Sequence, residues 1–267
     1  MARFESLPME LVRKIASNLS SSVTLVNGRR DLYAYGDLYR LCLVSSRCYA
    51  AAIPSLYGQI SSLISTKKQL SFVKTVITYP RLAELVKKLE FGIAFSCLEA
   101  LSIHDIDFLQ REIVGVGTEA SVMWDRITKS HSAFEAAMVG TVLKKLVWLE
   151  DLHLVWPFPS ISHLTRSIPE YETAAKPQLT SLKKMMLTAI SPGTGLSVMH
   201  PILAVSKVET VEAHRCRFIS DRSLNGMEYS SILNLHLFNC RFRPRELSRF
   251  LAKCPWPDMR CFNCYTF

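Results

Sequence analysis

The chain has 267 residues, of which 49% are hydrophobic and 21% are charged, and its formal net charge at neutral pH is +9. This composition allows a sizeable buried core and excludes a disordered chain, and no run of about 18 apolar residues predicts a membrane-spanning helix. Eight cysteines occur, and Arg3, Glu5 and Glu10 interrupt any apolar signal sequence, so we expect reduced thiols and a cytoplasmic or nuclear location.

Three apolar patterns in the first 60 residues predict three short helices. Leu11, Ile15 and Leu19 recur at a spacing of four and predict the apolar stripe of the first helix, with Ser6 as its cap and Pro8 in its first turn. The second and third patterns are Leu38, Leu41 and Val44, and residues 49–56. Three such helices bury too little surface for a full core, so we expect apolar side chains such as Leu7, Leu38 and Leu41 near the surface, against a partner.

The order of residues in these helices is the strongest motif of the chain. It runs Leu7-Pro8, Glu10-Leu11, Ile15, Leu19, Asp37-Leu38, Leu41, Val44-Ser45, Ala51 and Leu56. This order resembles an F-box. The resemblance implies a helical module that binds a Skp-type adaptor and, through the adaptor, a cullin. The adaptor-binding residues that it implies are Leu7, Pro8, Leu11, Ile15, Leu38, Leu41 and Val44.

One interval departs from the F-box pattern. Leu19 and Leu38 are separated by SSSVTLVNGRRDLYAYGD, whereas the family usually has only a few residues at this place. The Ser, Asn and Gly residues and the Arg29-Arg30 pair predict a surface loop over residues 20–36, which lengthens the connection at little entropic cost.

The C-terminal third contains a repeat of apolar-x-x-apolar-x-apolar-x-x-Cys. Its copies begin 24 residues apart, at Val208, Ile232 and Trp256. Weaker copies that lack the final Cys begin further upstream, at Val86, Leu149 and Leu182. The pattern resembles leucine-rich repeats, in which short strands stack side by side. We therefore expect Cys216, Cys240 and Cys264 to point inward in one row, with neighbouring strands about 4.8 Å apart.

Helical periodicity lies between the predicted strands. The apolar residues of a longer helical insertion around residues 98–145, with a break at Gly115 and Gly117, are Phe108, Ile113, Trp124, Ile127, Phe134, Met138 and Val142. A second helix is predicted over residues 244–251. The fold class is therefore α/β: a three-helix F-box over residues 1–60, then a helical linker and an irregular leucine-rich-repeat solenoid over 61–267, with short parallel strands and helical crossovers.

Patterns for chemistry are weak. Cys261-x-x-Cys264 with Cys254 nearby lacks the second ligand pair of a closed zinc site, and no phosphate loop or nucleophile elbow occurs. We expect no metal, no cofactor and no catalytic residue. The excess positive charge has no nucleic-acid recognition pattern beside it. Five arginines follow the last strands and suit either an acidic partner surface or solvated loops: Arg215, Arg217, Arg241, Arg243 and Arg245.

Recognition of a protein is what remains. Residues between the inward positions of each strand face the concave surface of a repeat protein. The substrate-binding candidates are His153, Trp156, Met186, Glu212, His214, His236, Phe238, Arg260 and Phe262. With the F-box resemblance, these imply the substrate-recognition subunit of a cullin-based ubiquitin ligase, itself not an enzyme. The alternative is a non-catalytic repeat scaffold whose F-box recruits no ligase.

Overall fold

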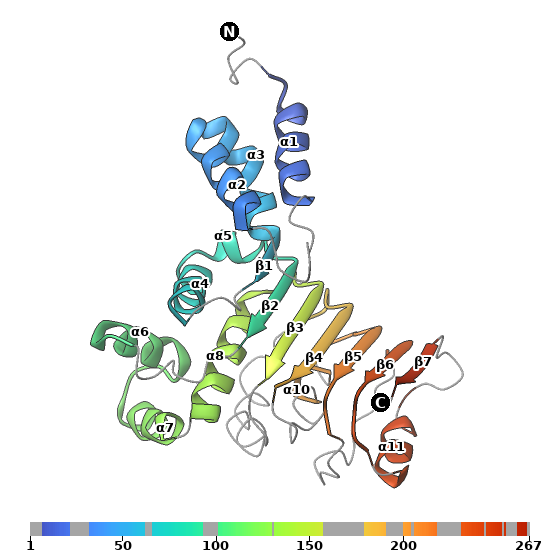
Figure 1. The fold of residues 1–267 in the computed structure, drawn as a ribbon. Coiled ribbons are helices and arrows are strands. Elements are labelled where there is room, and N and C mark those ends of the chain that lie inside the picture. Colours follow the sequence, from blue (N-terminus) through green and yellow to red (C-terminus); the bar gives the residue numbers. More distant parts are fainter. Residues whose placement is uncertain are drawn as a thin grey trace. The chain divides into compact units, whose positions relative to one another are not determined.

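The computed structural model of the chain (Figure 1) describes residues 7–21, 32–61, 66–92, 101–129, 131–156, 179–190, 200–203, 206–217, 231–242, 244–252, 254 and 261–265. Its contacts divide the chain into two compact units, the first comprising Met1–Ile60 and Leu85–Lys88, and the second Ser61–Glu84 and Leu89–Phe267. The division after Ile60 is where the sequence suggested a boundary. Leu85–Lys88 returns to the first unit, where Lys87 N donates to the Gly58 carbonyl at 3.0 Å.

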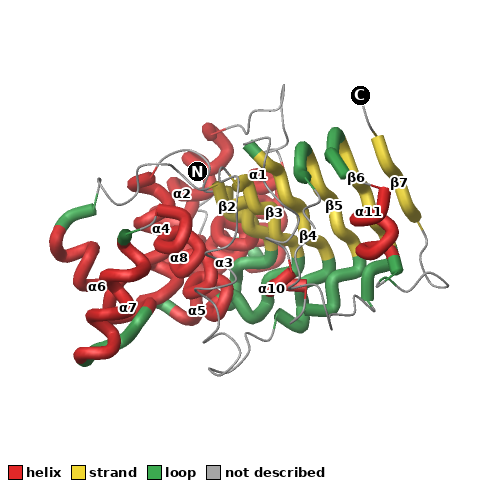
Figure 2. The backbone as a smooth tube through the Cα atoms, turned by 90° about the horizontal axis from the view of Figure 1, so that it is seen from below, coloured by secondary structure: helices red, strands yellow, loops and turns green. Residues whose placement is uncertain are grey.

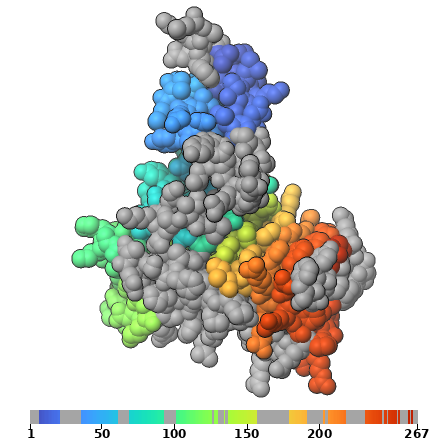
Figure 3. Space-filling model, viewed as in Figure 1, coloured from blue at the N-terminus to red at the C-terminus, as the bar shows by residue number. Residues whose placement is uncertain are grey.

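The first unit consists of helices α1 (Met9–Ser21), α2 (Leu32–Val44) and α3 (Ser46–Gly58), followed by the short strand β1 (Gln59–Ser61). The Pro8 carbonyl accepts the backbone N–H groups of Leu11 and Val12, which starts α1. The Ser45 hydroxyl accepts the Cys48 N–H at 3.1 Å and so caps α3. Figure 3 shows the dark blue atoms of α1 directly beside the lighter blue atoms of the next two helices.

The core of the first unit differs from the predicted stripe. Its buried residues are Val12, Ala16, Leu38, Leu41, Cys42, Cys48, Ala51 and Ala52. The stripe Leu11, Ile15 and Leu19 is offset by one residue: Ile15 and Leu19 only flank this core, and Leu11 is exposed. Small residues such as Ala16 let the helices approach closely, which explains why this neighbouring stripe is buried.

Two further expectations for this unit are wrong. Leu38 and Leu41 do not lie near the surface, because they are 0% and 6% exposed in the core between the helices. The expected loop over residues 20–36 is also too long, since α1 continues to Ser21 and α2 begins at Leu32. Residues 22–31 of this interval lie outside the described residues, as does the predicted cap Ser6.

The second unit is built on a parallel sheet. Its strands are β2 (Lys88–Gly92), β3 (Asp151–Trp156), β4 (Lys184–Ala189), β5 (Thr210–His214), β6 (Asn234–Phe238) and β7 (Cys261–Tyr265). They are neighbours in chain order (Figure 2), and every pair from β3 to β7 is parallel. Parallel strands need crossover connections, and the short helix α10 (His200–Leu203) and helix α11 (Pro244–Leu251) lie in two of these.

Alternate residues of each strand form the core of this unit. Two inward rows are at most 1% exposed: Leu152, Met185, Val211 and Leu235, and Leu154, Leu187, Ala213 and Leu237. The first residue of each of five copies of the sequence repeat is buried too: Val86, Leu149, Leu182, Val208 and Ile232. The predicted strands are therefore confirmed from β2 to β6, and the fold is α/β with short parallel strands.

The last predicted copy has a different register. Cys261 pairs with Asn234, and Cys264 pairs with Leu237, so Cys264 does not continue the row of Cys216 and Cys240. The strand begins three residues later than a period of 24 requires. An odd shift reverses which residues face inward. Phe262, which was expected to face outward, therefore occupies the inward register position opposite Leu235.

Helices precede β3 as predicted. After α4 (Thr66–Thr78) and α5 (Pro80–Ala83), the insertion contains α6 (Ile103–Ile113), α7 (Thr118–Thr128) and α8 (His131–Lys145). Gly115 and Gly117 separate α6 from α7 with φ of 85° and 129°, a region that favours glycine. Trp124 and Phe134 are buried edge to face, with ring centroids 5.8 Å apart. Among the described residues, no helix is long and apolar enough to cross a membrane.

The two sides of β4 differ in what they contribute to stability. Leu187 is fully buried, whereas its neighbour Met186 is partly exposed. Leu187→Ala is expected to lower the free energy of unfolding by about 2–5 kcal/mol, because it leaves a cavity in the inward row, and Met186→Ala by well under half of that. Urea denaturation of both variants measures the difference. Equal losses would contradict the assignment of the two faces.

Candidate functional site

The outward residues of β3 to β6 form a surface that we call the sheet face. It alternates with the buried rows and is partly exposed throughout. Its residues are Asp151, His153, Val155, Lys184, Met186, Thr188, Thr210, Glu212, His214, Asn234, His236 and Phe238. Because the strands are in register, residues that are 24 to 33 positions apart in the chain become neighbours on one rigid surface.

Polar side chains on the sheet face are held by partners on adjacent strands. Lys184 Nζ lies 2.6 Å from Glu212 Oε1. His153 is held on both sides, with Nε2 2.9 Å from Thr188 Oγ1 and Nδ1 3.3 Å from Glu90 Oε1 of β2. Cross-strand pairs of this kind orient side chains before any partner binds.

Aromatic rings stack at the end of β5 and β6. The His214 and Phe238 rings are nearly parallel at 16°, with centroids 4.5 Å apart. The His236 ring lies 6.3 Å from Phe238 at 13°. Asn263 Nδ2 is 3.1 Å from His236 Nδ1, which leaves that nitrogen as the acceptor. Preoriented aromatic side chains of this type are typical anchors of protein interfaces.

His214 is held in its neutral form. Burial lowers its pKa below the ordinary value of 6.5, and the positive charges of Arg215 and Lys184 and the nearby His153 act in the same direction, while Glu212 opposes them. Its Nε2 is buried and has no hydrogen-bond partner among the described residues. The stack therefore presents an uncharged imidazole beside Phe238.

The structure sorts the predicted substrate-binding residues into two groups. The residues that lie on the sheet face are His153, Met186, Glu212, His214, His236 and Phe238. Trp156 does not lie on the sheet face. It follows Leu154 by two positions on the same inward side of β3 and is only 1% exposed. Phe262 occupies an inward register position, and Arg260 lies outside the described residues. Sequence reasoning missed Lys184, Thr188 and Asn234 as candidates, although the same alternation marks them.

Arginines line the turns after β5 and β6. Arg217 and Arg241 are bridged in parallel, as their spacing in the repeat predicts, and both are exposed. Arg215 and Arg245 are also exposed, and Arg243 lies outside the described residues. The choice between an acidic partner surface and solvated charge stays open at these positions.

Large apolar side chains are exposed on the first unit. Pro8, Leu11 and Val44, three of the implied adaptor-binding residues, are exposed, whereas Leu7 and Ile15 are partly buried against the core. The implied contacts Leu38 and Leu41 are buried. Three further exposed apolar residues were missed: Tyr39, Leu43 and Tyr49. Tyr39 and Leu43 are four residues apart on α2, and this spacing could have identified them. A helix that is apolar on both sides suits burial in a larger assembly.

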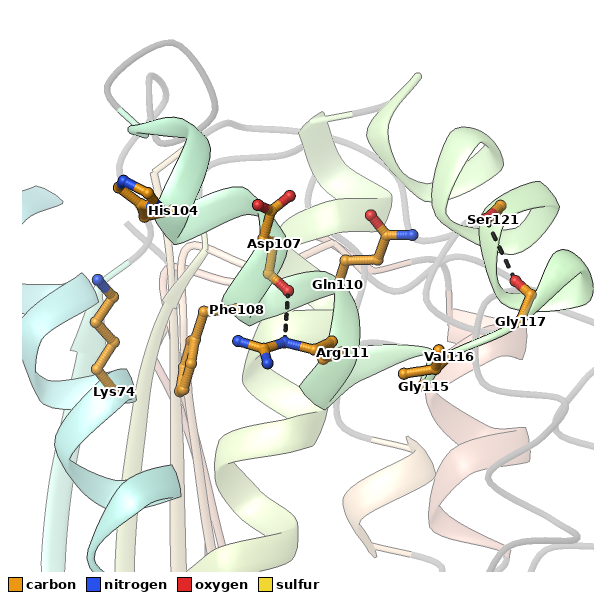
Figure 4. Close-up of a pocket in the computed structure, with 10 residues that line it drawn as sticks. All are labelled: Lys74, His104, Asp107, Phe108, Gln110, Arg111, Gly115, Val116, Gly117 and Ser121. Carbon is orange, nitrogen blue, oxygen red and sulfur yellow. Dashed lines mark hydrogen bonds between the residues drawn. The ribbon is translucent and has the colours of Figure 1, made fainter.

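A cavity of about 710 Å³ lies among α4, α6 and α7 (Figure 4). Its ten lining residues are Lys74, His104, Asp107, Phe108, Gln110, Arg111, Gly115, Val116, Gly117 and Ser121.

Several polar groups around this cavity already have partners. Lys74 pairs with Asp105 beside the cavity, and its Nζ lies 5.9 Å from the Phe108 ring centroid. Hydrogen bonds from Lys74 and Ser102 lower the pKa of Asp105 to about 2. Arg111 Nε donates to the Asp107 carbonyl oxygen at 3.3 Å, and Ser121 Oγ to that of Gly117 at 3.3 Å. The hydrogen bonds of these charged and hydroxyl groups serve helix structure.

Comparisons with family models, with curated proteins and with solved structures find no match for this chain. In the part of the chain that the structure describes, no group of three or more His, Cys, Asp or Glu side chains could hold a metal ion.

The lowered pKa of His214 makes stability depend on pH. The unfolded chain takes up the proton near the ordinary pKa of 6.5, before the folded chain does, so folding is destabilised as the pH falls through this value. We expect His214→Gln to lose less stability than the wild type between about pH 7 and pH 5. Urea unfolding at both values measures this. His104→Gln, at an exposed position, is the control. Equal losses in the wild type and His214→Gln would contradict the neutral assignment.

Proposed function

We propose that this protein is the substrate-recognition subunit of a cullin-based ubiquitin ligase. The first unit binds a Skp-type adaptor, and the sheet face of the second unit binds a protein substrate. The chain itself supplies binding, and the ligase supplies the chemistry. The proposal joins the F-box resemblance of the first 60 residues to two surfaces, one apolar and one polar and aromatic, each borne by a separate unit.

The observation that carries the proposal is the outer side of α2. Tyr39, Leu43 and Val44 are 57%, 67% and 53% exposed, although the opposite side of the same helix is buried in the core. Leaving three large apolar side chains in water on a helix of 13 residues is unfavourable, and burying each of them would contribute about 1.5–3 kcal/mol. An obligate partner surface explains this arrangement.

Position within the unit supports the same assignment. α2 gives way to α3 after the single residue Ser45, and this junction lies at the end of the unit where α1 begins (Figure 1). Val44 at the end of α2 and Pro8 before α1 are both exposed at this end. Two of the three exposed adaptor contacts that the resemblance implies thus lie at this end, whereas the buried pair Leu38 and Leu41 supports the helices from within.

Adaptor binding is tested by replacing the exposed side of α2. A variant with Tyr39→Ala, Leu43→Ala and Val44→Ala is expected to bind a purified Skp-type adaptor at least about 100-fold more weakly, because a few buried apolar anchors dominate the affinity of an interface. Isothermal titration calorimetry measures the affinity. The three replaced side chains are exposed, so the fold is retained, and circular dichroism verifies this.

The matched control replaces three exposed apolar residues of the second unit, Ile103, Val116 and Val122, by Ala. This variant is expected to bind the adaptor as the wild type does. If the wild-type chain does not bind the adaptor, the chain is better explained as a scaffold that recruits no ligase. If both variants bind it with wild-type affinity, the exposed side of α2 is not the adaptor-binding surface.

The substrate surface is tested separately with Met186→Ala and Phe238→Ala together. We expect this variant to keep adaptor binding. It should fail to capture a substrate protein that both the wild type and the α2 variant capture. Quantitative mass spectrometry of the three affinity purifications measures these losses. Proteins that depend equally on both surfaces, or on neither, would argue against a division of roles between the units.

A further inference from the structure

Cys216 and Cys240 occupy equivalent places in adjacent repeats. Each lies two residues beyond the end of its strand, after a residue with positive φ, Arg215 at 60° and Asn239 at 54°. Both are buried, at 1% and 4% exposure. The pairs on either side are in register, His214 with Phe238 before them and Arg217 with Arg241 after them.

This register fixes the separation of the two cysteines. Neighbouring strands of a sheet lie about 4.8 Å apart, and a disulfide needs Cα atoms about 4.4–6.8 Å apart. The backbone is also joined at this point, because Arg241 N donates to the Cys216 carbonyl at 2.9 Å. The two Cα atoms are therefore held within disulfide range by hydrogen bonds that do not involve the thiols.

Each thiol is hydrogen-bonded to a backbone carbonyl group. Cys240 Sγ donates back toward the preceding strand, to the Ala213 carbonyl oxygen at 3.3 Å. Cys216 Sγ donates to the carbonyl oxygen of His214 at 3.4 Å. A hydrogen bond between the two thiols, together with burial, raises the pKa of Cys216, and the same hydrogen bond lowers that of Cys240. Cys240 is thus the more readily ionised of the pair, and it is also the less buried, at 4% exposure against 1% for Cys216.

We propose that Cys216 and Cys240 are an oxidation-sensitive pair, in which Cys240 reacts first with a small hydroperoxide and Cys216 then closes a disulfide between adjacent repeats. The Cys240 thiolate attacks the peroxide O–O bond, which yields a sulfenic acid and hydroxide, and the hydroxide takes up the proton released from a thiol. The Cys216 sulfur then displaces water from the sulfenic acid. Two thiols lose two electrons, and one hydrogen peroxide becomes two molecules of water.

The disulfide would act on the sheet face. Each thiol lies within hydrogen-bonding distance of a carbonyl oxygen of the aromatic stack, Cys216 of His214 at 3.4 Å and Cys240 of Phe238 at 3.6 Å. Oxidation removes these donors and cross-links the turns that follow β5 and β6, two residues beyond the stacked His214 and Phe238 rings. The geometry thus links the redox state of the chain to the residues that shape the candidate recognition surface.

Mass spectrometry of the whole protein tests the pair. The reduced chain is treated with hydrogen peroxide under native conditions, blocked with an alkylating reagent and digested. We expect a peptide that joins Cys216 to Cys240 and disappears after treatment with dithiothreitol. Cys254 is the internal control, because it is also buried, burial raises its pKa to about 11 and its thiol donates to the Phe250 carbonyl oxygen of the preceding helix α11. It should stay alkylated.

The order of reaction is tested by trapping sulfenic acid with a 1,3-diketone. In the wild type, a brief exposure to peroxide should label Cys240 and not Cys216, and Cys216→Ser should increase the label on Cys240. A link that forms only in denaturant would overturn the proposal. So would preferential pairing of either residue with another cysteine, or labelling of Cys216 in place of Cys240. The wild-type measurements decide the matter if the serine variant does not fold.

Discussion

Parallel pairing of β3 to β7 in one register is the interaction on which the second unit depends. It stacks Leu154, Leu187, Ala213 and Leu237 in one buried row and the residues between the rows on the opposite side. A slip of one residue in any strand would expose its inward side chains, at about 1.5–3 kcal/mol for each large one. The hydrophobic row therefore fixes the position of every polar residue of the sheet face.

The sheet face shows how little of its polar chemistry serves stability. Lys184 and Glu212 are close, but such partly exposed ion pairs contribute about 0–1 kcal/mol. Their effect is geometric, since they hold side chains in place around the stacked His214 and Phe238 rings. The neutral His214 matters for the same reason, because its Nε2 is buried without a hydrogen-bond partner among the described residues, and a charged imidazole would need one there. The rigid strands thus keep the aromatic surface oriented without a partner.

The first unit divides its apolar residues between two roles. Leu38 and Leu41 hold α2 against α1 and α3, whereas Tyr39 and Leu43 on the same helix remain in solvent. In this unit, the motif residues Leu38 and Leu41 therefore stabilise the fold, and the neighbouring residues Tyr39 and Leu43 provide the exposed surface. Buried cysteines have a similar structural role in the turns of the second unit. Cys216, after β5, donates to a carbonyl group of β5, and Cys240, after β6, donates to a carbonyl group of the preceding strand β5.

By itself, the sequence determined which segments become helices and strands. The alternation around Leu152, Met185, Val211 and Leu235 identified four strands, and Gly115 and Gly117 marked a break between helices, because these patterns are properties of a few adjacent residues. Only the tertiary structure decided which of two adjacent stripes of α1 is buried, and that the step from β6 to β7 is not 24 residues. The buried stripe of α1 depends on how closely α2 and α3 pack against it. The step from β6 to β7 depends on how many residues the connection through α11 needs. A repeat counted along the chain could not reveal that Cys264 pairs in register with Leu237, whereas the equivalent places of Cys216 and Cys240 followed from their equal distance from two strands in register.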